Sequence, residues 1–368
     1  MAPTTFTTER FCDDLGPQMV VHLYEPRSGL RAMAVIDNTA CGPAVGGVRM
    51  AADVTLTEVY RLARAMTLKN AAAGLPHGGG KSAIVADPAK ADKPQLIRAF
   101  ARAIRHLVDY IPGPDMGTDE SCMAVIHDEN GRSVGLPRVL GGIPLDEIGA
   151  TGYGLAQCAE VAAPFCGLKL QGATVAVEGF GNVGRHAAAF LGKAGVRLVA
   201  ASDSRGAIYN PDGIDVAELA SVKRQTGSVT AYGRAKQIPL PELFTLPCDI
   251  LLPAARPDCI ESGNAEKIQA KLVLQGANIP ATPSAETILH RRGVIVVPDF
   301  IANAGGVICA AVEYAGGSEA DVFHRIGGKI RENTEVVLKR SRDEKCEPRI
   351  AALALARERV KAAMTFRR

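Results

Sequence analysis

The chain has 368 residues, of which 47% are hydrophobic and 22% charged, and its formal net charge is +3. This length suffices for two domains of ordinary size with separate cores, and the composition is typical of a globular protein. A charge this small, with no stripe of lysine and arginine, argues against a nucleic-acid partner.

The sequence also argues against a membrane, a secretory or a metal-binding role. No apolar run approaches the roughly 20 residues of a membrane span, and residues 1–14 are polar and acidic where a secretory signal is basic and apolar. The nine cysteines form no C-x-x-C pair and are interpreted as reduced core thiols, and the histidines lack ligand spacing. We therefore expect a cytoplasmic protein without a metal.

In the N-terminal part, short apolar segments alternate with helical patterns. Residues 19–25 and 31–36 are predicted to form paired strands joined by a turn. Residues 55–75 follow the helical period, with a threonine before them and a glycine near the end. After a glycine-rich turn, a strand is predicted over 81–88 and a second helix over 93–110.

The pattern changes after residues 141–154, which we interpret as a hinge. Residues 173–178 form a buried strand candidate that leads through a glycine loop into a helix and then into a strand at 196–201. Further short buried strands are predicted at 248–253, 270–278 and 293–300. Buried parallel strands that alternate with helices predict a doubly wound α/β sheet. Two charged helices within 329–360 are expected to pack back on the earlier domains.

The loop GFGNVG at residues 179–184 follows a predicted strand and opens a predicted helix, the context of a dinucleotide-binding fingerprint. Gly179 permits the tight turn, Gly181 lets the backbone approach a pyrophosphate, and Gly184 lets helix and strand pack closely. The pyrophosphate would lie at the helix N-terminus, where amide groups and the helix dipole favour anions.

The next strand ends at Asp203, where a carboxylate can accept hydrogen bonds from both ribose hydroxyls. This favours NAD, because the 2′-phosphate of NADP would face a negative charge. Ser204 and Arg205 follow directly and soften that preference, so NADP is not excluded.

The stretch GLPHGGGKS at residues 74–82 is close to a phosphate-binding loop, but its spacing is wrong. A P-loop, G-x-x-x-x-G-K-[ST], requires a glycine where Leu75 stands. A P-loop also follows a strand and opens a helix, whereas this stretch follows a helix and leads into a strand. We therefore do not expect Lys81 to hold nucleotide phosphates.

Two lysines in this region lie among apolar residues. Lys69 lies on the apolar side of its predicted helix, and Lys81 lies beside an apolar strand. A buried lysine needs an anionic partner, although Lys69 could also snorkel at the helix end. Together they predict a small-anion site, in which one lysine holds a carboxylate and the cationic neighbour and desolvation lower the pKa of the other. Asp115, in a Pro- and Gly-rich turn, is either a third member or an ordinary turn residue.

Motifs along nearly the whole chain carry a resemblance to a known family. They are GPAVGGVRM (42–50), AMTLKNAAAGLPHGGGKS (65–82), GPDMGT (113–118), ATGYG (150–154), GFGNVGR (179–185), PAA (253–255), GANIPATPSAE (276–286) and NAGGV (303–307). At these positions the chain resembles the amino acid dehydrogenases that act on glutamate, leucine, valine and phenylalanine.

The resemblance implies a fold and a reaction. Residues 1–146 would form an α/β substrate-binding and oligomerisation domain, with C-terminal helices from about 335–368 packing back on it. Residues 147–334 would form a Rossmann-type dinucleotide-binding domain, with the active-site cleft between the two. The reaction would be reversible NAD(P)-dependent oxidative deamination of an L-amino acid to a 2-oxoacid and ammonia, carried out by a homo-oligomer.

The resemblance also implies individual roles. Lys81 would be the catalytic lysine that activates water, Asp115 would exchange protons with the amino group, and Lys69 would bind the substrate carboxylate. The other implied substrate contacts are Val45, Gly46, Gly47, Gly113, Pro114, Asn278, Val307 and Ala310. The implied cofactor contacts are Thr151, Gly179, Gly181, Asn182, Val183, Gly184, Asp203, Ala254, Ala255 and Asn278.

The substrate side chain is expected to meet an apolar site. Glutamate-specific members carry a lysine where this chain has Val45 and a serine where it has Ala310. We therefore expect an aliphatic amino acid such as leucine or valine. Glutamate is one alternative, since ATGYG and GANIPATPSAE are closer to the glutamate branch. An aromatic amino acid is another, because Val45, Gly113 and Ala310 are small. A non-catalytic sensor of NAD or amino acids is a further alternative, but it would not need Lys81 and Asp115 together.

Overall fold

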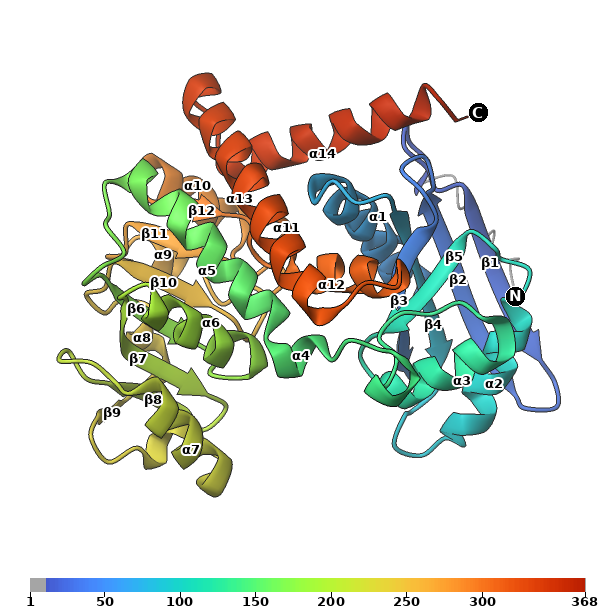
Figure 1. Ribbon diagram of the computed structural model, residues 1–368, viewed down its shortest axis with the longest axis horizontal. Helices are drawn as coiled ribbons and strands as arrows, with labels where there is room; N and C mark the ends of the chain where they lie inside the picture. The colour runs from blue at the N-terminus through green and yellow to red at the C-terminus, as the bar shows by residue number, and fades with distance from the viewer. Residues whose placement is uncertain (1–10, 368) are drawn as a thin grey trace, which may run out of the picture. The chain divides into compact units, whose positions relative to one another are not determined.

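The structure is a computed structural model that describes residues 11–367 (Figure 1). The N-terminal residues 1–10, which bear on the expectation about a secretory signal, lie outside the described part. The chain forms two compact units. The first consists of the residues up to Pro144, Ala310–Glu319 and the residues from Ala356 onward; the second consists of Leu145–Cys309 and Ala320–Leu355.

The first unit is built on a mixed five-stranded sheet with the order β1-β2-β4-β3-β5. Its strands are β1 (Met19–Glu25), β2 (Leu30–Asn38), β3 (Ala44–Ala51), β4 (Gly78–Val85) and β5 (Tyr110–Pro114). β2 pairs antiparallel with β1 and β4, whereas β3 pairs parallel with β4 and β5. Its helices are α1 (Leu56–Ala72), α2 (Lys93–Ala103), α3 (Glu120–Asn130) and the short 3-10 helix η2 (Arg138–Leu140).

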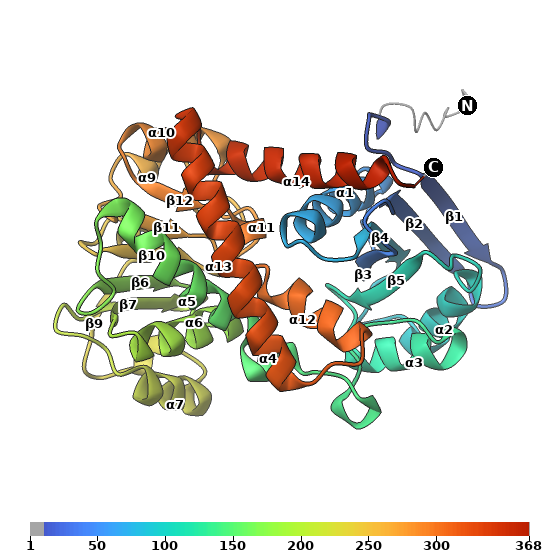
Figure 2. The same ribbon diagram turned by 45° about the horizontal axis from the view of Figure 1, so that its top comes forward.

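Helices cover both faces of this sheet, because side chains alternate along each strand. Val35 of β2 packs with Ala63 of α1 in one buried cluster. Ala32, on the other face of the same strand, packs with Phe100 of α2 in a second cluster that also includes α3. Figures 1 and 2 show α1 on one side of the sheet and α2 with α3 on the other.

The predicted elements of this unit are confirmed in part. Helix α1 begins after Thr55, whose side chain accepts a hydrogen bond from the Glu58 amide, as a capping threonine does. The helix predicted over 93–110 is wrong in its last third, because α2 ends at Ala103 and β5 begins at Tyr110. Strand pairing replaces the predicted helix there, because residues 110–114 pair in register with β3.

The second unit contains a seven-stranded sheet with the order β12-β11-β10-β6-β7-β8-β9. The first five of these strands are parallel to their neighbours, and β8 and β9 extend the sheet in antiparallel fashion. The strands are β6 (Thr174–Glu178), β7 (Arg197–Asp203), β8 (Gly206–Tyr209), β9 (Lys236–Ile238), β10 (Ile250–Pro253), β11 (Leu272–Leu274) and β12 (Ile295–Val297). This is the predicted doubly wound α/β arrangement.

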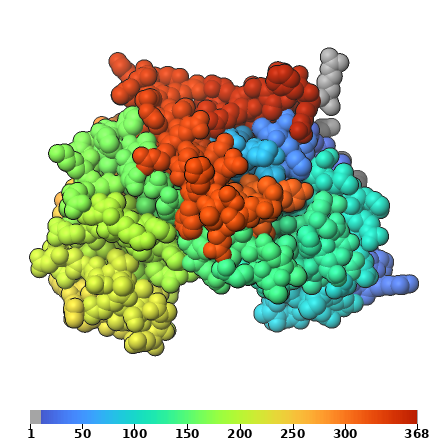
Figure 3. All heavy atoms as spheres, in the orientation of Figure 1, coloured from blue at the N-terminus to red at the C-terminus, as the bar shows by residue number. Residues whose placement is uncertain are grey.

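Helices connect these strands and flank the sheet. They are α4 (Leu145–Ile148), α5 (Ala150–Ala162), α6 (Asn182–Lys193), α7 (Val216–Thr226), α8 (Leu240–Leu243), α9 (Ser262–Ala265), α10 (Pro283–Arg291) and α11 (Asp299–Ala302), with 3-10 helices η3 (Ala163–Cys166) and η4 (Val229–Ala231). Three helices contain residues of both units: α12 (Gly305–Tyr314), α13 (Glu319–Glu344) and α14 (Pro348–Met364). Figure 3 shows α13 at the surface beside α5, where Arg331 donates a hydrogen bond to Gln157.

Candidate active site

Three neighbouring strands of the first unit bring Lys81, Gly47 and Asp115 together. Gly47 of β3 pairs with Gly113 of β5, and Asp115 is the first residue after β5. The buried side chain of Lys81, on β4, forms an ion pair with the Oδ2 of Asp115. The spatial association of Lys81 with Asp115 therefore agrees with the pair predicted from the sequence.

The backbone around Asp115 is fixed by a short turn. The Asp115 amide donates to the Oγ1 of Thr118 at 3.0 Å, and the Thr118 hydroxyl donates to the Val48 carbonyl of β3 at 2.8 Å. Asp115 is therefore tied to the strand that lies next to Lys81, and its role in proton transfer stays a prediction.

Sequence reasoning missed a third charged member of this cluster, Arg49. Its Nε lies 2.8 Å from the Oδ1 of Asp115, and its Nη1 pairs with Glu58 at the start of α1. A signal was present: Gly47 and Arg49 are two residues apart, so in a strand they face the same side. The strand β3 itself was not predicted, because two glycines interrupt its apolar pattern.

Burial and charge act together on the two proton-carrying groups. Burial lowers the pKa of the Lys81 amine below its usual value; Asp115 opposes this effect, and the positive charge of Arg49 adds to it. Burial raises the pKa of Asp115, but the ion pairs with Lys81 and Arg49 outweigh it and hold that pKa below its ordinary value. Arg49 is a cation that acts on Lys81 and that sequence reasoning did not include, and the effect predicted for Lys69 stays a prediction.

The glycines before Lys81 are not a flexible turn, as the sequence suggested, but the first residues of β4. Gly78 begins the strand, and all three glycines are buried. A Cβ built on Gly79 would lie 2.0 Å from the Thr67 amide nitrogen of α1, and one on Gly46 would lie 1.7 Å from the Gly80 carbonyl oxygen. The glycines are therefore required because backbone packs directly against backbone.

Lys69 lies in the last turn of α1 and is half-buried. The fully buried stripe of this helix runs one position aside and includes the polar residues Thr67 and Asn70. Thr67 donates to the Oδ2 of Asp37 at 2.5 Å, and Asn70 donates to the Gly78 carbonyl at 2.7 Å. The carboxylate-binding role of Lys69 stays a prediction.

An apolar cluster includes two of the predicted specificity residues. Val45, Ile111 and Val134 are buried together, and Ala310 of α12 packs against them. A Cβ on Gly113 would lie 3.1 Å from the Cγ2 of Val134, so Gly113 borders the same cluster. Sequence reasoning missed Ile111 and Val134. The predicted contact Pro114 is exposed at the end of β5, and Val307 belongs to the second unit.

In the second unit, the fingerprint glycines have the geometry that a dinucleotide needs. Gly179 has a φ of +89°, and a Cβ on Gly184 would lie 2.1 Å from the Gly179 carbonyl oxygen. A Cβ on Gly181 would meet no atom within 4 Å, so this side of the loop is open. Gly181 is also the N-cap of α6, which continues through Asn182 and Val183. These residues fit the pyrophosphate of a dinucleotide.

Asp203 ends β7 as predicted, but its carboxylate already has partners in the protein. Its Oδ2 accepts a hydrogen bond from the Val229 amide at 2.7 Å, and its Oδ1 accepts one from the Ser228 hydroxyl at 3.2 Å. Lys223 lies 3.8 Å from the Oδ2. To bind ribose hydroxyls as predicted, the Asp203 carboxylate would have to accept their hydrogen bonds in addition to those from Val229 and Ser228.

The other predicted cofactor residues lie at the ends of neighbouring strands and helices. Ala254 and Ala255 follow β10, and a Cβ on Gly179 would lie 2.5 Å from the Ala255 Cβ. Thr151 lies in the first turn of α5, and a Cβ on Gly306 would lie 3.4 Å from its Oγ1.

Asn278 lies in the loop after β11 and is held by a neighbour that sequence reasoning missed. Asn303 donates to the Oδ1 of Asn278 at 3.1 Å. The next residue, Ile279, has a φ of +49°, and its amide donates to the Oδ2 of Asp299 at 3.0 Å. A left-handed isoleucine is strained, and such strain is typical of functional sites.

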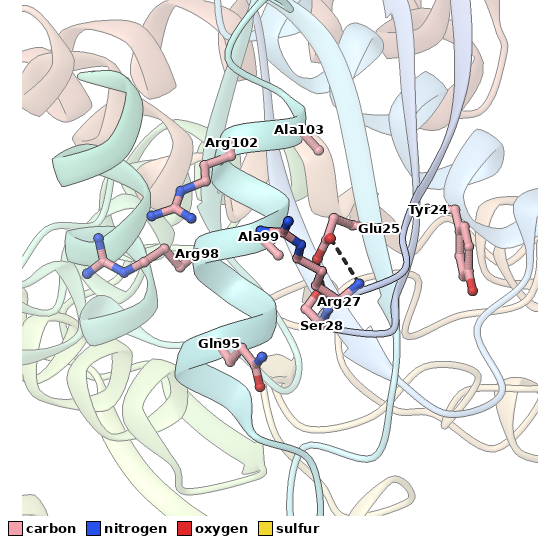
Figure 4. Close-up of a pocket in the computed structure, with 9 residues that line it drawn as sticks. All are labelled: Tyr24, Glu25, Arg27, Ser28, Gln95, Arg98, Ala99, Arg102 and Ala103. Atoms are coloured by element: carbon pink, nitrogen blue, oxygen red, sulfur yellow. Dashed lines mark hydrogen bonds between the residues drawn. The ribbon is translucent and has the colours of Figure 1, made fainter.

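A separate pocket of about 530 Å³ lies in the first unit between the β1–β2 turn and α2 (Figure 4). Two of its arginines, Arg98 and Arg102, pair with Glu129 at 2.6 and 3.1 Å. None of the predicted site residues lines it. Within residues 11–367, no group of three His, Cys, Asp or Glu side chains is arranged to hold a metal, and no helix is long and apolar enough to cross a membrane.

Two protein-family models match most of this chain. A model of the Glu/Leu/Phe/Val dehydrogenase dimerisation domain matches residues 17–132, and a model of the Glutamate/Leucine/Phenylalanine/Valine dehydrogenase matches residues 141–368. The chain belongs to this family. It is an NAD(P)-dependent amino acid dehydrogenase, and curated relatives include both NAD-specific and NADP-specific glutamate dehydrogenases.

Individual relatives of this amino acid dehydrogenase match most of its length. The glutamate dehydrogenase of Aeropyrum pernix is 43% identical over 90% of this chain and 85% of that protein. The catabolic NAD-specific glutamate dehydrogenase of Bacillus subtilis is 38% identical over 86% of this chain and 79% of that protein. Among solved structures, the hetero-hexameric glutamate dehydrogenase of Thermus thermophilus, in a leucine-bound form, matches with a TM-score of 0.83 and 33% identity over 96% and 90% of the two chains.

Proposed function

We propose that this dehydrogenase deaminates its amino acid with Lys81 and Asp115 as the proton-transfer groups. The observation that carries the proposal is the buried ion pair between them, next to Gly47 and Arg49. Burial lowers the pKa of the Lys81 amine and so favours its neutral form, which can accept a proton in general acid–base catalysis.

The chemistry divides among these residues and the cofactor. A dinucleotide held at Gly179, Gly181 and Gly184 would supply the hydride acceptor for the substrate Cα. Lys69 binds the substrate carboxylate, and neutral Lys81 takes a proton from the water that adds to the iminium carbon of the oxidised substrate. Asp115 exchanges a proton with the amino group, which leaves as ammonia. Breaking the carbon–nitrogen bond then yields the 2-oxoacid.

The relatives favour glutamate as the amino acid. The curated relatives described above are named glutamate dehydrogenases, and one of them shares 43% identity over most of both chains. We therefore place glutamate ahead of leucine or valine, the substrates expected from the sequence.

One observation favours a second candidate, an apolar amino acid. Val45 and Ala310 lie in a hydrophobic cluster with Ile111 and Val134. By the family resemblance, Val45 and Ala310 stand where glutamate-specific members carry a lysine and a serine. Burying a side-chain carboxylate among these four apolar side chains would carry a desolvation cost that none of them offsets.

Initial rates of NADH and NADPH formation with twenty L-amino acids decide between the two. A glutamate dehydrogenase has its highest kcat/KM with glutamate. An enzyme with an apolar site turns over leucine, valine or phenylalanine faster, and Val45→Lys then shifts its preference towards glutamate. No turnover of any of the twenty would contradict the proposed function.

We also infer that the chain forms a homo-oligomer. The match of residues 17–132 to a dimerisation domain supports this inference, and the hetero-hexameric Thermus relative supports assembly into an oligomer. Light scattering after size exclusion tests it, and the mass of a single chain would contradict it.

A further inference from the structure

Glu313 holds a loop of the first unit by three backbone amides. Its Oε1 accepts hydrogen bonds from Gly135 at 2.7 Å and from Leu136 at 3.1 Å, and its Oε2 accepts one from Ile143 at 2.9 Å. The three donor residues are buried. A carboxylate can satisfy all three, since it accepts on both oxygens, and charge-assisted hydrogen bonds are among the stronger ones.

The loop between these amides, residues 135–143, closes on itself. The Gly142 amide donates to the Pro137 carbonyl at 3.1 Å, and a Cβ on Gly142 would lie 1.7 Å from the Leu136 carbonyl oxygen. The carboxylate therefore fastens both ends of one compact loop. The tip faces solvent, where Val139 is 88% exposed.

The residue immediately before this loop is Val134, which belongs to the apolar cluster with Val45 and Ile111. The Val134 amide donates to the Pro112 carbonyl at 2.9 Å, and Gly135 packs against Pro114, with a Cβ there lying 2.6 Å from the proline Cδ. The Glu313 bond to Gly135 therefore acts one residue from the side chain that borders Gly113.

Glu313 also connects the loop to the remaining member of the cluster. Ala310 and Glu313 are three residues apart on α12, so they share one face of the helix. Ala310 packs against the cluster, while Glu313 holds the loop behind Val134. One helix face thus fixes both the Ala310 side and the Val134 side of the same apolar site.

We propose that Glu313 is a positioning residue for substrate selectivity: its three amide bonds set the spacing between Ala310 and Val134, and with it the size of amino-acid side chain that the enzyme accepts. This rests on the second candidate of the proposed function, the apolar amino acid, whose side chain the cluster around Val45 would receive. Glu313 touches neither substrate nor cofactor in this proposal.

The test compares wild type with Glu313→Gln, Glu313→Ala and the control Glu319→Gln. Gln keeps an acceptor for one pair of amides but presents an NH₂ group to the third, so its effect should lie between those of wild type and Ala. Glu319 binds the same loop through Arg138 at 2.5 Å, but both side chains are largely exposed. A surface pair of this kind contributes little.

For each protein, kcat and KM are measured with valine, leucine, phenylalanine and glutamate, together with the KM for NAD. We expect Glu313→Gln to change the ratio of kcat/KM between the largest and smallest accepted side chains by about tenfold, mainly through the KM for the amino acid. The KM for NAD and the control should stay within about twofold of wild type.

An equal loss with every amino acid, or an unchanged ratio in a folded Glu313→Gln enzyme, would overturn the inference. If Glu313→Ala does not fold, the Gln variant decides alone. Absence of turnover by wild type with all four amino acids is a different result, because it contradicts the proposed function and the inference built on it.

Discussion

Gly47 lies against Lys81, and the ion pair of Lys81 fills the space that a side chain on Gly47 would need. A Cβ built on Gly47 would lie 3.0 Å from the Lys81 Nζ and 2.8 Å from the Asp115 Cβ. Its neighbour Gly46 faces the other way, and a Cβ there would lie 1.7 Å from the Gly80 carbonyl oxygen. Gly47 is therefore required because the Lys81–Asp115 ion pair occupies the space beside it, and Gly46 is required because the backbone of β4 packs against it.

This difference predicts opposite phenotypes for two alanine variants. Gly46→Ala should destabilise the fold by about 3 kcal/mol, because backbone of β4 would have to move. Gly47→Ala should destabilise the fold less than Gly46→Ala, because it meets side-chain atoms of Lys81 and Asp115 rather than backbone. It should lose about 100-fold in kcat/KM, since the alignment of this ion pair is lost. Thermal melts and initial rates measure the two effects. Equal losses of stability in both variants would contradict the assignment.

Lys81→Ala removes the proposed proton acceptor. We expect kcat to fall by about 10² to 10⁴-fold, the usual contribution of a general acid–base group. The exposed Lys90, which pairs with Asp87 at 3.3 Å, supplies the control Lys90→Ala and should keep full activity. Robust turnover by Lys81→Ala would rule out the proposed mechanism.

The pH profile of deamination should respond to the two charges beside Lys81. Because the neutral amine accepts the proton, the rate rises as pH increases through the lowered pKa of Lys81. Arg49 lowers this pKa and Asp115 raises it. Arg49→Gln should therefore move the rising limb to higher pH, and the residual activity of Asp115→Asn should rise at lower pH. Shifts in the same direction would contradict this assignment, as read from kcat/KM against pH.

Some of this site could be predicted from sequence because the signal was local. The fingerprint at residues 179–184 follows its own strand and opens its own helix, so context and spacing identify it together. Lys81 and Asp115 were found separately, as a lysine in an apolar setting and an acid in a glycine-rich turn. The family resemblance gave them their roles.

The partners that sequence reasoning missed are brought in by pairing between distant elements. Arg49 reaches Asp115 only because β3 lies between β4 and β5, an order that no local pattern encodes. Val134 lies outside any helix or strand and still packs with Val45. Glu313, almost 180 residues further along the chain, accepts a hydrogen bond from the next residue, Gly135. Their burial depends on tertiary contacts, which periodicity does not reveal.

Asp203 should govern the choice between NAD and NADP. Its charge would repel a 2′-phosphate, while its bonds to Ser228 and Val229 keep it in place. Asp203→Asn should raise the ratio of kcat/KM for NADP over NAD by about tenfold, because a like-charge repulsion is removed. The exposed Asp212 gives the control Asp212→Asn. An unchanged ratio would mean that Asp203 serves only the fold.

Arg349 should support the strained loop that carries Asn278. It pairs with Asp299 at 3.0 Å and with Glu286 at 2.6 Å, and Asp299 in turn accepts the hydrogen bond of Ile279. Arg349→Met would leave two poorly exposed carboxylates without their cation, a change that costs about 3 kcal/mol or more.

The same variant should weaken the binding of NAD, because Ile279 holds its left-handed conformation only while Asp299 is fixed. The control is Arg342→Ala, since Arg342 pairs with Asp343 at the surface and both side chains are 65% exposed. It should change stability by less than about 0.5 kcal/mol. Chemical denaturation and fluorescence titration with NADH measure the two quantities. A variant that loses stability but binds NADH with the wild-type Kd would separate Arg349 from the cofactor loop and leave it a purely structural role.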